Sequence, residues 1–140
     1  MSRLTIAVDV DLTIVDTLGP WLQHFESVTG VKYPTHEGRE KYHLGPIMQA
    51  LAMDAGVPYD PNEYWRQSNL YDNMKPDFFV ANEVQTLNCD HDVIFVSACF
   101  PEHEASKRAF CREFFGDIPF ISTHHKEYID FDVMIDDCDE

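Results

Sequence analysis

Four short apolar runs divide the chain, and polar residues follow each of them directly. The runs cover residues 4–8, 92–96, 118–121 and 133–135. Their length and their β-branched residues are typical of strands buried on both faces of a parallel sheet. Between them, apolar residues recur at three- and four-residue spacing, which is typical of amphipathic helices. This alternation predicts an α/β fold whose parallel sheet has right-handed connections.

Five helices are expected outside these strands. Apolar spacing, Pro and Gly place them at about residues 18–28, 46–55, 61–67, 78–87 and 101–115. Asp16 can cap the first helix, and Gly30 should end it. The buried side of the last helix is expected to carry Ala105, Ala109, Phe110 and Phe114, with Gly116 as its end.

No stretch between residues 17 and 88 has convincing strand character. We therefore expect an α/β core formed by residues 1–16 and 76–140. Residues 17–75 are expected to form a small helical cap, inserted after the first strand and lying over the turn that follows it. At 140 residues, the chain has the length of one domain with a modest insert.

The formal net charge of −15 excludes some classes of partner. Nucleic-acid polymers and anionic membrane surfaces are bound by basic surfaces, so neither is expected here. A small phosphorylated ligand remains compatible if a metal ion and local cations offset its charge. No apolar stretch approaches the length that spans a bilayer, and the first 15 residues do not resemble a signal peptide. Four cysteines without C-x-x-C spacing favour reduced thiols and a cytoplasmic protein (Cys89, Cys99, Cys111 and Cys138).

The first candidate site is the acidic turn after the first strand. Asp9 and Asp11 stand where that strand should end, and this edge of a parallel sheet is where ligands bind. Two carboxylates so close repel each other unless a cation lies between them, which favours a hard metal ion such as Mg²⁺. The alternative is that both are ordinary turn and N-cap residues.

The other strands also end in polar residues of particular types. Ser97 follows the second strand, Lys126 lies in the loop after the third, and Asp136 and Asp137 follow the fourth. In a parallel sheet all these groups meet at one edge. Two acidic pairs, a hydroxyl and an ammonium are what phosphoryl transfer through a metal ion requires, because one carboxylate can then attack phosphorus.

The order Asp9-x-Asp11-x-Thr13, Ser97, Lys126 and Asp136-Asp137, each after an apolar strand, resembles the four motifs of the haloacid dehalogenase (HAD) superfamily of phosphatases. The helical insert and the layout of Tyr64-Trp65 and Leu70-Tyr71 are similar to the 5′(3′)-deoxyribonucleotidases within it. The resemblance implies a Rossmann-like HAD core and an Mg²⁺-dependent phosphatase. Its substrate would be a small phosphomonoester, namely a nucleoside monophosphate.

The resemblance also implies roles for the first acidic pair. Asp9 would be the nucleophile, forming an aspartyl-phosphate intermediate, and a ligand of Mg²⁺. Asp11 would protonate the leaving oxygen and then activate water, while its backbone carbonyl joins the metal ligands. This division agrees with general chemistry, since a carboxylate bound to metal is a poor base and a second acid should handle protons.

The remaining motifs would bind phosphate and metal. Ser97 and the backbone N–H of Ala98 would donate to phosphate oxygens, and Lys126 would neutralise the phosphoryl group. Asp137 would complete the metal ligands, with Asp136 as a further ligand or close neighbour. Lys107 is the rival for the lysine role, but its charged neighbours on the helix, Arg108 and Arg112, favour a solvated face.

The chain departs from the nucleotidase pattern at four places. Leu12 stands where many of these enzymes have Gly, the chain lacks the aromatic residue that they have near the position of Thr17, and Ala98-Cys99 stands where they tend to have Ser-Pro. The sequence stops three residues after Asp137. This leaves two alternatives, a sheet without its edge strand or a homodimer in which the partner covers the edge.

Several alternatives stay open. Aromatic residues of the insert are expected mainly in its core, with one or two stacking on a base (Trp21, Tyr42, Tyr64, Trp65 and Tyr71). The substrate could be another small phosphomonoester, such as a sugar phosphate. A non-catalytic alternative is a receiver-like signalling or metal-binding domain, which also gathers acids, a hydroxyl and a lysine.

Overall fold

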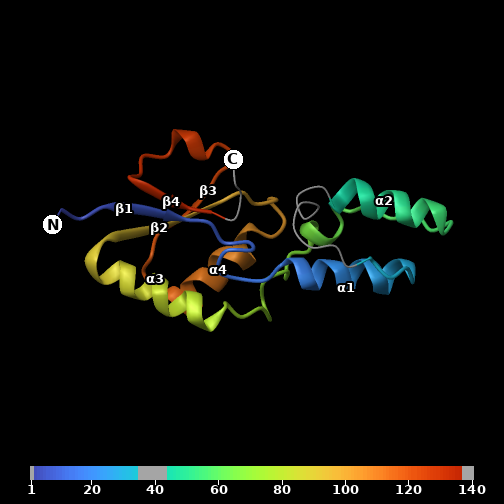
Figure 1. Ribbon diagram of the computed structural model, residues 1–140, viewed down its shortest axis with the longest axis horizontal. Helices are drawn as coiled ribbons and strands as arrows, with labels where there is room; N and C mark the ends of the chain where they lie inside the picture. The colour runs from blue at the N-terminus through green and yellow to red at the C-terminus, as the bar shows by residue number, and fades with distance from the viewer. Residues whose placement is uncertain (1, 35–43, 137–140) are drawn as a thin grey trace.

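The computed structural model describes residues 2–34 and 44–136 and shows an α/β fold (Figure 1). Four parallel strands form one sheet in the order β3-β2-β1-β4. The strands are β1 (Thr5–Val8), β2 (Asp92–Ser97), β3 (Phe120–Ser122) and β4 (Val133–Ile135). Helices flank this sheet, as in Rossmann-like proteins, so the predicted fold class is confirmed. In the described ranges, no helix combines the length and apolar character needed to cross a membrane.

Strand β1 lies between β2 and β4, and its register is well defined. Val8 lies opposite Phe95 on one side and opposite Ile135 on the other. At the start of β1, Asp132 links β1 to the residue just before β4 through two hydrogen bonds. Its carboxylate accepts from Thr5 N at 2.8 Å, and its own N–H donates to Thr5 O at 2.9 Å. The apolar run predicted as the first strand is therefore the centre of the sheet.

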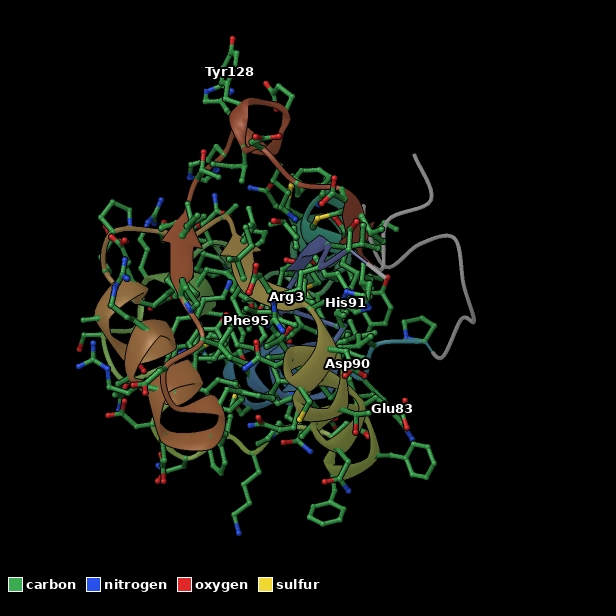
Figure 2. The ribbon with its side chains drawn as sticks, turned by 90° about the vertical axis from the view of Figure 1, so that its left-hand side faces the viewer. Arg3, Glu83, Asp90, His91, Phe95 and Tyr128 are labelled. Atoms are coloured by element: carbon green, nitrogen blue, oxygen red, sulfur yellow. The ribbon has the colours of Figure 1, made fainter. Side chains whose placement is uncertain are left out.

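Helices α3 (Phe78–Asp90) and α4 (Glu104–Phe115) lie along the same face of the sheet (Figure 1). The main hydrophobic core lies between this face and the two helices. Phe95 points into it, whereas Tyr128 projects from the outer side of the loop between β3 and β4 (Figure 2). Asp77 caps α3 by accepting a hydrogen bond from Val80 N at 3.0 Å.

The buried side of α4 differs from the sequence prediction. Ala105 and Ala109 are exposed, whereas Phe110 is buried and Phe114 half-buried. The buried side instead carries His103, Ser106, Lys107, Phe110, Cys111 and Phe115. Burying alanine methyl groups stabilises a helix little compared with burying phenylalanine, so the larger side chains determine which face meets the sheet.

Residues 17–75 contain α1 (Leu18–Thr29), α2 (Leu44–Asp54) and the short 3₁₀ helix η2 (Tyr64–Arg66). Asp16 accepts hydrogen bonds from Leu18 N and Gly19 N, and Gly30 ends α1 with a left-handed backbone, as predicted. The third expected helix is only this one turn. Helices α1 and α2 share a second hydrophobic core around Phe25 and Met48, whereas Tyr64 of η2 belongs to the main core. A separate core is compatible with a cap insert, whose boundaries stay a prediction.

The turn after β1 requires an unusual backbone at Leu12. Its φ angle is +61°, in the left-handed region that favours glycine. The turn closes through Leu12 N donating to Val15 O at 2.8 Å and Ile14 N donating to Val10 O at 3.0 Å. Leu12 therefore carries backbone strain of about 1 kcal/mol immediately beside the two acidic residues.

This strain predicts that glycine is more stabilising than alanine at position 12, the reverse of their order in ordinary helices. The Leu12→Gly variant should exceed Leu12→Ala in free energy of unfolding by about 1 kcal/mol, because only glycine adopts this backbone without strain. Both variants lose the same side-chain contacts beyond Cβ. Urea denaturation measures the difference.

The matched control is Leu22 on α1, where alanine should exceed glycine by about 1 kcal/mol, as in ordinary helices. If alanine is also the more stable residue at position 12, the left-handed turn does not carry the strain inferred here.

Candidate active site

The carboxyl ends of the four strands point toward the side of the sheet where α1, α2 and η2 lie (Figure 1). Asp9 follows β1 directly, and its N–H donates to Ile135 O at 2.9 Å, so β1 and β4 end side by side. Thr123 N donates to Ser97 O at 3.0 Å, which brings the ends of β2 and β3 together in the same way. The backbone pairing therefore gathers the polar residues that follow these strands.

The first group of side chains is centred on Lys126. Its Nζ lies 3.3 Å from Asp9 Oδ1 and 3.1 Å from Asp136 Oδ2. Lys126 belongs to the short 3₁₀ helix η3 (Lys126–Tyr128) in the loop after β3. One ammonium thus joins carboxylates from the ends of two neighbouring strands.

The electrostatics of Asp9 reflect this crowding. Burial raises the pKa of the Asp9 carboxyl from 3.8 to about 7, because the charged form loses water. The Lys126 ammonium opposes this shift, whereas the nearby carboxylates of Asp136 and Asp11 add to it. For Lys126, burial alone would lower the pKa, but the two carboxylates that it contacts raise it. Burial thus disfavours the ionised form of Asp9, and the neighbouring Lys126 ammonium favours it.

The second group of side chains is centred on Asp11. Lys107 Nζ donates to Asp11 Oδ2 at 2.6 Å, and the Tyr71 hydroxyl donates to Asp11 Oδ1 at 2.6 Å. The Lys107 ammonium is fully buried and also donates to Ala98 O at 3.1 Å. Burial and the adjacent Asp11 carboxylate raise the pKa of the Tyr71 phenol, which therefore keeps its proton. Asp11 and Asp9 thus have separate partners although they are two residues apart.

Ser97 and Ala98 lie where the sequence analysis expects them, at the end of β2. Ser97 is buried, and Ala98 is exposed in the loop that follows. This loop meets the Lys126 loop, because His124 Nε2 lies 3.2 Å from Cys99 O. The contact of Lys107 with the Ala98 carbonyl links the same loop to Asp11.

Most of the predicted site residues come together, although their chemical roles stay a prediction. Contacts join Asp9, Lys126 and Asp136 in one group, and Asp11 and Ala98 in the other. Asp137 lies outside the described residues, as does Tyr42.

The prediction for Lys107 is wrong, because the residue lies on the buried side of α4 and not on a solvated face. The misplaced helix face explains the error. His103, Lys107, Phe110 and Cys111 follow the three- and four-residue spacing of the observed buried side, and this spacing was the available signal.

Tyr71, considered above only for a cap core or a stacked base, donates its hydroxyl to Asp11. No sequence signal indicates this contact, because 60 positions separate the two residues.

The carboxylates of Asp9 and Asp136 are oxygen ligands of the kind that Mg²⁺ takes, and both contact the Lys126 ammonium. Mg²⁺ is often held by one or two carboxylates together with substrate phosphates. Within residues 2–34 and 44–136, no three His, Cys, Asp or Glu side chains group closely enough to hold a metal ion by themselves.

Comparison with known proteins gives a distant relationship. No family model matches the chain. It is 26% identical, over 147 aligned residues, to proteins of Staphylococcus aureus strains MSSA476 and MW2, each named "Putative 5′(3′)-deoxyribonucleotidase". A protein of the same name from strain Mu50 has the same identity. Each alignment covers 98% of this chain and 75% of the relative. The similarity to these proteins thus extends along nearly the whole length of the chain.

Proposed function

We propose that this protein is an Mg²⁺-dependent phosphomonoester hydrolase of the HAD type that dephosphorylates nucleoside monophosphates, with deoxyribonucleotides as the preferred class. The observation that carries the proposal is the separation of the two acids of the first turn. Asp9 contacts Lys126, and Asp11 contacts Lys107. A reaction with one nucleophilic carboxylate and one proton-transferring carboxylate requires this separation.

In the proposed reaction, an Asp9 oxygen attacks phosphorus and the bond from phosphorus to the substrate oxygen breaks. Asp11, which has to be protonated for this step, gives its proton to that leaving oxygen. Asp11 then takes a proton from water, whose oxygen attacks the phosphorus of the aspartyl-phosphate and restores Asp9. The nucleoside and inorganic phosphate leave, and both carboxyl groups return to their starting states.

The remaining residues would hold the phosphoryl group during both steps. Lys126 supplies positive charge beside Asp9, and the Ser97 hydroxyl and the Ala98 N–H would donate to phosphate oxygens. Asp9, Asp136, Asp137 and the Asp11 carbonyl would hold Mg²⁺. The bound ion would neutralise charge on the phosphate oxygens and orient them for in-line attack.

The similarity to the named staphylococcal proteins supports nucleotides as the substrate class. The position of α1, α2 and η2 beside the carboxyl edge of the sheet also supports it, because these elements can cover a nucleoside attached to the phosphate (Figure 1). A net charge of −15 would repel nucleic-acid polymers while a monophosphate reaches a local cationic site.

A phosphate-release panel with and without Mg²⁺ tests the proposal. We expect dUMP and dTMP to be hydrolysed faster than AMP, and AMP faster than sugar phosphates, with activity lost in EDTA and restored by Mg²⁺. Faster hydrolysis of a sugar phosphate would favour the other phosphatase alternative. No release from any substrate, with a long-lived adduct from acetyl phosphate, would favour a receiver-like domain.

A further inference from the structure

The Asp11 carboxylate is held by both of its oxygens. The Tyr71 hydroxyl donates to Oδ1 and the Lys107 ammonium to Oδ2, each at 2.6 Å. Lys107 places a positive charge beside Asp11, and a reaction on phosphate requires positive charge. The Tyr71 hydroxyl is neutral, so its hydrogen bond to Asp11 needs a different explanation.

The Tyr71 side chain is itself fixed on several sides. Its ring contacts His103 and Phe110, with centroid distances of 5.4 and 6.0 Å, and only 1% of the residue is exposed. Lys107 Nζ lies 5.4 Å from the centre of the same ring. The ring that carries the hydroxyl is therefore held rigidly. The same ring contacts Lys107, the other hydrogen-bond donor to Asp11.

The backbone at Tyr71 is anchored to α4. Tyr71 N donates to Ser106 Oγ at 2.9 Å, and the Ser106 hydroxyl donates to Asp72 Oδ1 at 2.8 Å. Because Ser106 precedes Lys107 on α4, the two donors of Asp11 are fixed to each other. A shift of either donor would move the carboxylate that both hold.

We infer that Tyr71 is a positioning residue that holds the Asp11 carboxyl at the angle needed to give a proton to the leaving oxygen and then to take one from water. The inference rests on the proposed phosphatase function. Without the hydroxyl, one oxygen of Asp11 loses its donor and the group can rotate about its Cβ–Cγ bond. Small displacements of a proton-transferring group slow catalysis strongly, since a misplacement of about 1 Å can cost about 100-fold.

The test compares two substrates of the Tyr71→Phe variant, which keeps the ring and its contacts. A nucleoside monophosphate releases an alkoxide that needs a proton, whereas p-nitrophenyl phosphate releases a phenolate that leaves without one. We expect kcat/KM for dUMP to fall about 10- to 100-fold. With p-nitrophenyl phosphate the fall should be less than about 3-fold, and KM should change little with either substrate.

The ratio of kcat/KM for dUMP to kcat/KM for p-nitrophenyl phosphate is measured on one preparation. A lower folded fraction of the variant therefore does not alter this ratio. The control variant is Tyr59→Phe, which removes a buried tyrosine hydroxyl that lies 3.0 Å from His24 Nδ1 in the other core. Its ratio should equal that of the wild type. In an Asp11→Asn background, Tyr71→Phe should not change the ratio further, because Tyr71 acts through Asp11.

Equal falls for both substrates in Tyr71→Phe would overturn the inference while leaving the phosphatase proposal in place. So would a further change of the ratio in the Asp11→Asn background. A wild-type protein that hydrolyses neither substrate would overturn both proposals, and the wild-type measurement alone separates this outcome from the others.

Discussion

Replacing Asp9 by asparagine is expected to lower kcat for every substrate at least about 1,000-fold, because the amide is no nucleophile toward phosphorus. The fold should persist, since asparagine has nearly the same shape and lacks the charge whose burial raises the pKa of Asp9. Phosphate release measures the first effect and circular dichroism the second. Acid-quenched wild-type enzyme should also carry label from a ³²P-labelled substrate, and the variant should carry none.

The matched control is Asp90→Asn, the same change at an exposed carboxyl at the end of α3, away from the carboxyl edge of the sheet (Figure 2). Its activity should equal that of the wild type. If Asp9→Asn hydrolyses phosphomonoesters at the wild-type rate, the attacking group is not Asp9 and the assignment of this turn is wrong.

The Lys107→Met variant is expected to lose about 3 kcal/mol of unfolding free energy, because it leaves the Asp11 carboxylate without its buried counter-ion. At about 3 °C for each kcal/mol, the midpoint of thermal unfolding should fall by roughly 10 °C. Methionine fills similar space, so loss of packing contributes little. Urea denaturation and thermal unfolding both measure the loss.

The control is Arg112→Met, which removes a charge from the exposed side of the same helix and should change the unfolding free energy by less than about 0.5 kcal/mol. Adding Asp11→Asn to Lys107→Met should recover part of the loss, because no unpaired charge then remains. If Lys107→Met is as stable as Arg112→Met, the ion pair with Asp11 does not stabilise the fold.

Sequence reasoning located the strand ends because the signal there is local. Each strand is an apolar run, and parallel pairing brings the residues after the runs to one edge whatever the helices do. Asp9, Lys126 and Asp136 meet for this reason. The resemblance to HAD phosphatases added the order of the motifs. That order requires a parallel sheet whose strand ends lie at one edge, and the observed sheet has this arrangement.

The partners of Asp11 depend on tertiary packing and could not be found in the same way. Two alanines on α4 suggested one helix face, but larger side chains turn the helix so that Lys107 is buried. The contact with Tyr71 depends on how the segment before α3 crosses α4, and no periodicity encodes that crossing. In physical terms, strand alternation specifies an edge, whereas the rotation of a helix results from small differences in buried area.

The hydrogen bonds between Asp132 and Thr5 have a consequence for assembly of the site. They set which residue of β4 lies beside which residue of β1, and Asp136 is the first residue after that strand. A slip by one position would turn its side chain to the opposite face, away from Asp9 and Lys126. Under the proposed function, a misaligned β4 would yield a folded but inactive protein, so the two hydrogen bonds between Asp132 and Thr5 align a strand on which the proposed site depends.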